Sequence, residues 1–121
     1  RLPASVPSNS YQVYFMGEVP DRNTAEGTGT TFNIVPGLNL NSDAYPVSRK
    51  WTSTVMSVVL PINAQILTWN ETNQAYNAPV TKTVFGWGAS GNALTIDPGV
   101  GYWIRTTGTV SFSETKPYTW P

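Results

Sequence analysis

The sequence contains no cysteine and no histidine among its 121 residues. Without cysteine there are no disulfide bonds and no thiol chemistry, and without both residue types zinc and other soft metals lose their usual ligands. A calcium loop of the DxDxDG kind is absent too, although Asp43 or Asp97 with backbone carbonyls could still hold calcium weakly. The sequence therefore predicts neither a cofactor nor a dedicated metal site.

Charged residues are also scarce. They make up 12% of the chain, about half the share in a typical soluble domain, and seven acidic residues balance seven basic ones. A chain without net charge has no electrostatic field to attract nucleic acid or an anionic membrane surface. No stretch approaches the ~20 apolar residues of a membrane-spanning helix. We expect neither nucleic acid nor a membrane as a partner.

The composition also bears on location. With few charges, the surface must be covered by Thr, Ser, Asn and Gln, which is typical of extracellular β-rich proteins. The chain begins at Arg1 rather than Met, as it would after cleavage by a signal peptidase or another processing protease, or in a shortened expressed fragment. We expect a protein that is secreted or attached to the cell surface.

Catalytic groups are sparse. A nucleophilic serine needs a base, and with no histidine only a lysine or a carboxylate could serve. Glycoside hydrolysis needs a pair of carboxylates, but the seven acidic residues are scattered, mostly over turns and strand ends. We expect no catalytic residues, and a protein that works by binding or by assembly.

Extended segments separated by turns follow one another along the chain. β-branched and aromatic residues dominate the segments, while Asn, Gly, Pro and Asp fill the separators. Seven short strands at even spacing are typical of an all-β fold, either an antiparallel β-sandwich or a barrel-like domain. The expected strands span residues 11–19, 30–35, 64–69, 80–87, 93–96, 100–106 and 109–114.

At most one short helix is expected, between residues 48 and 59. Trp51, Val55 and Val58 recur there at helical spacing, and Ser48 is a candidate N-cap. The β-branched residues of the same stretch oppose a helix. Both alternatives stay open.

Three parts are expected along the chain. Residues 1–20 hold a strand-like segment that subunits could exchange, residues 21–29 are a polar, glycine-bearing loop, and residues 30–121 form the β-sandwich body.

Several motifs of this body resemble a family of small β-domains in secreted and surface-attached bacterial proteins. The resemblance covers about residues 30–110. It rests on DPGVGYWIR (97–105), which matches a PG-x-G-[FY]-W-[VI] hairpin of the family, and on WNETNQAY (69–76). The second stretch resembles the family's WN-x4-Y hairpin, with five residues instead of four between Asn70 and Tyr76. The stretch PGLNLNS (36–42) departs from the family pattern because it lacks the usual tryptophan. The resemblance implies a bacterial, extracellular β-domain without catalytic residues, and it names no ligand.

The first hypothesis for function is a structural protein, the subunit of a surface filament or fibre. The N-terminal strand-like run is apolar on both faces, which suits a strand held between two neighbours better than a free edge. Donation of this strand to the next subunit would build an open, head-to-tail polymer. The expected interface residues are Tyr11, Val13, Tyr14, Phe15, Met16 and Val19.

The alternative is a carbohydrate-binding module. Five tryptophans and six tyrosines exceed what one small core requires, and exposed rings stack on the C–H faces of sugars. Trp87, Trp120 and Tyr118 are the expected glycan platform. Rings of the hairpin motifs, such as Trp69, Tyr76 or Trp103, are expected to fill the core or to join such a platform. An adhesin domain with an unidentified partner and a small enzyme also stay open.

Overall fold

The computed structural model describes residues 30–114 and 116–118. Strands dominate, all paired strands are antiparallel, and the helices are short, so the all-β prediction is confirmed. In chain order the elements are β1 (Thr30–Ile34), β2 (Gly37–Ser42), β3 (Arg49–Lys50), the 3-10 turn η3 (Trp51–Ser53), α1 (Val55–Val59), β4 (Gln65–Asn70), β5 (Ala75–Tyr76), β6 (Val80–Thr81), α2 (Gly88–Ala93), β7 (Thr95–Ile96), β8 (Gly101–Thr106) and β9 (Val110–Glu114).

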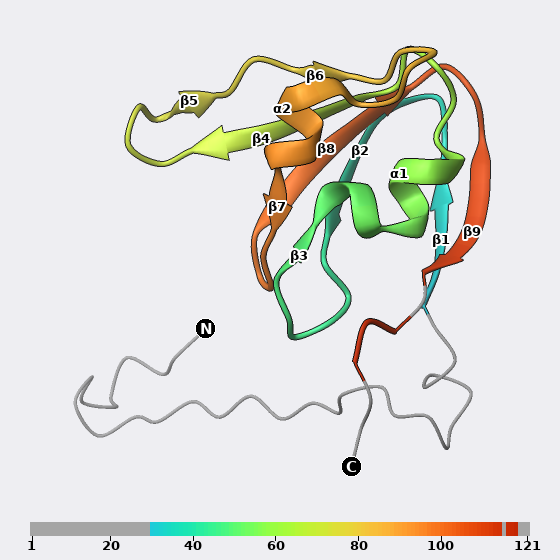
Figure 1. The fold of residues 1–121 in the computed structure, drawn as a ribbon, viewed down its shortest axis with the longest axis horizontal. Helices are drawn as coiled ribbons and strands as arrows, with labels where there is room; N and C mark the ends of the chain where they lie inside the picture. Colours follow the sequence, from blue (N-terminus) through green and yellow to red (C-terminus); the bar gives the residue numbers. More distant parts are fainter. Residues whose placement is uncertain (1–29, 115, 119–121) are drawn as a thin grey trace, which may run out of the picture.

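The main sheet has the strand order β2-β8-β4-β5, and β6 also pairs with β4. A second ribbon, β1-β9, continues from the first two strands of this sheet (Figure 1). Ile34 pairs with Val110 and Gly37 pairs with Thr106, so two residues of one strand oppose three of the other between these pairs. Such an extra residue bends a ribbon, and Pro36 cannot donate to the ladder there. The bend lets the two sheets face each other across one core.

The core lies inside this bend, together with α1 and α2 (Figure 1). Trp51 is its centre, fully buried and edge-on to Trp87 at 5.1 Å and to Tyr102 at 6.0 Å between ring centroids. The indole of Trp87 donates a hydrogen bond of 2.8 Å to the Ser57 carbonyl in α1. Aliphatic side chains from both sheets, from the separate β3-β7 pair and from α1 with its C-cap complete the cluster, among them Ile34, Met56, Leu60, Ile66, Ile96 and Ile104.

The helix expected between residues 48 and 59 is present, but its cap is Thr54 rather than Ser48. The Thr54 hydroxyl accepts a hydrogen bond of 3.0 Å from the Ser57 N–H, and α1 begins at the next residue. At the other end Lys82 donates to the carbonyls of Ser57, Val58 and Leu60 at 2.6–3.0 Å. Side chains from outside the helix therefore satisfy both ends of this single turn.

The prediction of at most one short helix was wrong, because residues 88–93 form α2. This helix follows the point where the strand expected over residues 80–87 breaks off. Thr83 and Gly86 exchange two backbone hydrogen bonds of 2.8 and 3.0 Å in a tight turn. Gly86 has a positive φ of 95°, which ends the extended run. The buried Trp87 then leads into α2.

Candidate functional site

One surface of the main sheet faces away from the core and carries apolar and aromatic side chains. On β8 the residues Tyr102, Ile104 and Thr106 are buried, so the alternate residues Trp103 and Arg105 point outward. The register places partners beside them on the neighbouring strands. We call this surface the outward face; its residues are Leu38, Leu40, Gln65, Leu67, Trp69, Tyr76, Thr81, Trp103 and Arg105.

Strand β2 has the reverse of the usual pattern. Its leucines, Leu38 and Leu40, are 59% and 64% exposed, whereas Asn39 and Asn41 point to the core side and are half-buried. The Asn39 amide donates to the Val35 carbonyl at 2.8 Å and accepts from the Val35 N–H at 3.1 Å, so it holds the bend after β1. A shift of one residue would bury the leucines instead. The register of β2 thus keeps two large apolar side chains in solvent.

Three aromatic side chains form a cluster on the outward face. Trp69 and Tyr76 are directly paired across β4 and β5, edge to face, with ring centroids 5.0 Å apart. The Trp103 indole donates a hydrogen bond of 2.8 Å to the Tyr76 hydroxyl. Because β4 lies between β8 and β5, these two side chains meet above β4. We call Trp69, Tyr76 and Trp103 the aromatic cluster; Trp69 and Tyr76 are 43% and 52% exposed.

Amide side chains border the aromatic cluster at the β4–β5 hairpin. Asn77 donates to the Thr68 hydroxyl at 2.9 Å and accepts from Asn70 at 3.3 Å. The Asn70 side-chain oxygen also accepts from the Asn73 N–H at 3.0 Å, which closes the turn. These bonds fix the hairpin, and with it the positions of Trp69 and Tyr76.

The β1-β9 ribbon provides an internal comparison. Its outward pairs are polar: Thr31 with Ser113, whose hydroxyls are 3.2 Å apart, and Asn33 with Ser111, joined by a hydrogen bond of 2.8 Å. The outward side of the continuous ribbon is therefore polar along β1-β9 and apolar along β2-β8. The apolar outward face is a local feature of the main sheet.

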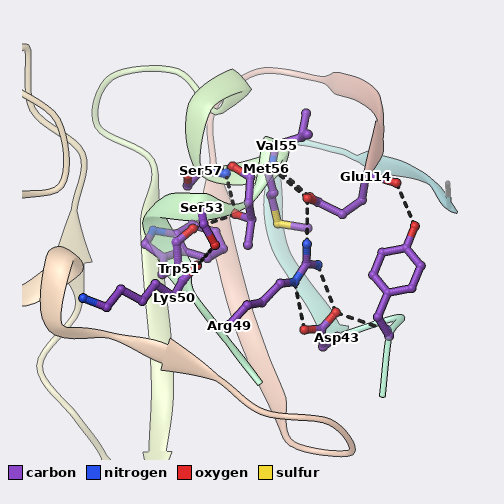
Figure 2. A network of polar contacts seen from close by, with 11 residues as sticks. Asp43, Arg49, Lys50, Trp51, Ser53, Val55, Met56, Ser57 and Glu114 are labelled. Carbon is purple, nitrogen blue, oxygen red and sulfur yellow. Dashed lines mark hydrogen bonds and ion pairs between the residues drawn. The ribbon is translucent and has the colours of Figure 1, made fainter. Parts of the chain in front are cut away.

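The second cluster of interest is ionic and buried (Figure 2). The Arg49 guanidinium lies between Asp43 and Glu114, at 2.9 Å from each, and the three side chains are 10%, 0% and 1% exposed. Burial works against the charge of Arg49, but its hydrogen bond to Asp43 and the charges of both carboxylates raise its pKa above the ordinary value. Glu114 also accepts hydrogen bonds from the N–H groups of Val55 and Met56, at 2.8 and 3.1 Å.

This ionic cluster joins β3, the start of α1 and the end of β9, and every charge in it has a partner. Both oxygens of Asp43 are bonded to Arg49, so Asp43 is not available to bind calcium. Of the two weak calcium ligands expected from the sequence, this leaves Asp97. Nearby Tyr102 is buried, and burial, with the charge of Asp43, raises the pKa of its hydroxyl far above the ordinary value. Within the described part of the chain, no group of three acidic side chains gathers in a way that could hold a metal ion.

The structure corrects one residue of the expected glycan platform. Trp87 is 6% exposed and belongs to the core, because its ring packs on Trp51 and its N–H is bonded inside α1. Tyr118 is half-buried, edge-on to Tyr45 at 6.0 Å. Trp120 and the expected interface residues Tyr11, Val13, Tyr14, Phe15, Met16 and Val19 lie outside the described residues.

A shallow groove of about 580 Å³ runs between residues 77–81 and α2. The buried Trp87 forms part of its wall, and the other lining side chains are mainly small or aliphatic. It has no cluster of charged or nucleophilic groups, so it is a weaker candidate site than the outward face.

The chain matches no protein-family model, no curated protein and no solved structure. Of the helices described, none has the length and apolar character required to cross a membrane.

Proposed function

We propose that this chain is a non-catalytic, glycan-binding domain of a secreted or surface-attached protein, and that the outward face binds the glycan. The observation that supports this most strongly is the aromatic cluster. Trp69, Tyr76 and Trp103 lie together, partly exposed, on the surface of a sheet whose one other aromatic residue, Tyr102, is buried.

The chemistry of a sugar matches this surface. A pyranose ring offers apolar C–H groups on its faces and hydroxyl groups around its rim, so it pairs with an aromatic face bordered by hydrogen-bonding groups. The Tyr76 hydroxyl accepts the bond from Trp103 and keeps its own proton to donate. The amides of Asn70 and Asn77 stand at the adjacent hairpin.

A purely structural role explains the aromatic cluster less well. Rings that only stabilise a fold are buried, as Trp51 and Trp87 are in this chain. Exposed apolar side chains are ordinary when they are scattered, but a contiguous set marks a surface that binds something. The polar exterior of the β1-β9 ribbon shows that the fold does not itself require an apolar exterior.

Affinity electrophoresis on a panel of polysaccharides tests the proposal. At least one polysaccharide should retard the wild-type chain, and Trp69→Ala should weaken that binding by about 1–3 kcal/mol, roughly 5- to 150-fold. Phe85→Ala is the matched control, because Phe85 is an aromatic residue that is 96% exposed at the tip of the Thr83–Gly86 turn, off the outward face. It should bind like the wild type.

The proposal fails if no polysaccharide retards the wild-type chain, or if Trp69→Ala is retarded as strongly as the wild type. Equal losses in Trp69→Ala and Phe85→Ala would also contradict it, because they would point to nonspecific adhesion of exposed rings.

Assembly by strand addition is the second candidate. The observation in its favour is the edge of β2, which pairs only with β8 and has no strand on its other side among the described residues. Size-exclusion chromatography separates the candidates, since a polymer would favour strand addition and a monomer would favour the glycan-binding domain.

A further inference from the structure

Arg105 is the charged residue of the outward face. Its row in the sheet runs from Leu38 through Arg105 to Gln65, and all three point outward. Trp103 stands two residues earlier on the same face of β8, about 6.6 Å away along the strand. Arg105 therefore stands beside the Trp103 end of the aromatic cluster, and Trp69 and Tyr76 lie two residues farther along the sheet.

Arg105 differs from Arg49 in having no ion pair with an acidic side chain of the described residues. Arg49 is buried and binds two carboxylates, and these are the only ion pairs among the described residues. Arg105 is exposed and belongs to neither pair. No acidic residue occupies any other position of the outward face. The face thus presents a single positive charge, with Leu38 on one side of it, Gln65 on the other and Trp103 two residues along the strand.

A guanidinium binds a pair of anionic oxygens through two parallel N–H groups, which makes arginine suited to carboxylate, sulfate and phosphate groups. Nucleic acid carries a phosphate on every nucleotide and needs several cations for tight binding. A single cation beside stacking rings matches a ligand with one anionic group per sugar or per few sugars.

The geometry points to an acidic polysaccharide as the ligand, with a sugar stacked on the aromatic cluster and its carboxylate or sulfate group held by Arg105. This inference rests on the proposed glycan-binding function and names the class of glycan. Arg105 supplies specificity for the anionic group, while the aromatic cluster supplies the stacking surface.

Matched pairs of ligands test the charge alone. Polygalacturonate is compared with its methyl ester, and dextran sulfate with dextran, so each pair shares a backbone and differs in the anionic group. In buffer of about 20 mM ionic strength, where screening is weak, the wild-type chain should bind one acidic member about tenfold or more tightly than its neutral partner. Which pair shows the preference distinguishes carboxylate from sulfate.

Two variants assign the preference to Arg105. Arg105→Gln should reduce the affinity for the acidic member to that for its neutral partner, and Arg105→Lys should recover only part of it, because an ammonium lacks the planar fork. Lys50→Gln, which removes an exposed cation from β3, should keep the full preference.

The outcomes separate the two proposals. The assignment of an acidic ligand is overturned if acidic and neutral members bind equally, or if the preference survives Arg105→Gln. In either case the glycan-binding function still stands if binding depends on Trp69. Absence of binding to every member, and to the wider panel, overturns both.

Discussion

Replacing Arg49 by methionine is expected to lower the free energy of unfolding by about 3–5 kcal/mol. The substitution leaves Asp43 and Glu114 without a counter-ion, although their side chains are 0% and 1% exposed. Glu114 would keep its hydrogen bonds from Val55 and Met56, but those alone do not offset the charge of two buried carboxylates. Urea denaturation followed by tryptophan fluorescence measures the change.

Lys50→Met is the matched control, because it removes the neighbouring cation of β3 from an exposed position. It should change the stability by less than about 0.5 kcal/mol. A stability loss in Arg49→Met no larger than that in Lys50→Met would show that the ionic cluster does not organise the fold.

Replacing Trp51 by alanine is expected to cost about 3–5 kcal/mol, a large part of the stability of a domain of this size. Trp51 is fully buried, and its ring contacts Trp87 from α2 and Tyr102 from β8. Its removal leaves a cavity where the two sheets and the helices meet. The same denaturation experiment measures the loss.

Trp69→Ala makes the identical chemical change on the outward face. It loses one edge-to-face contact with Tyr76 from a side chain that is already 43% exposed, so its stability should fall by about 0.5–1.5 kcal/mol. The pair of variants separates fold from function: Trp51→Ala should reduce stability, and Trp69→Ala should mainly reduce glycan binding. Equal stability losses in the two variants would mean that Trp69 belongs to the core.

Several strands could be predicted from the sequence because their signals are local. Residues 64–69, 100–106 and 109–114 are close to the observed β4, β8 and β9, since turn residues bracket β-branched and aromatic runs there. The helical spacing of Trp51 and Val55 likewise indicated the region of η3 and α1, but not the cap at Thr54.

The predictions from sequence were wrong where contacts with residues far along the chain determine which side chains are buried. Trp87 was expected at the surface, yet its burial depends on Trp51, 36 positions earlier, and on the Ser57 carbonyl. The orientation of β2 could not be predicted because its leucines alternate with asparagines, and alternation alone does not say which set faces the core. Its pairing with β8 settles that question, and no local pattern encodes this pairing.

The aromatic cluster could be predicted only in part from the sequence. The stretch from Trp69 to Tyr76 indicated a hairpin with paired rings, and the structure has that pairing. Whether the rings pointed inward or outward depended on the burial of Ile66 and Ile104, which sets the faces of β4 and β8. Arg105 joins the cluster only through the register of β8 with its two neighbours.

The indole N–H signals in a two-dimensional ¹H–¹⁵N NMR spectrum test the central claim most directly. The wild-type chain is titrated with oligosaccharides cut from the polysaccharide that retards it most strongly. We predict that the signals of Trp69 and Trp103 shift with a common saturation curve, while those of Trp51 and Trp87, which lie in the core, stay in place. Shifts confined to other tryptophans, or no shift at saturating oligosaccharide, would contradict glycan binding by the outward face.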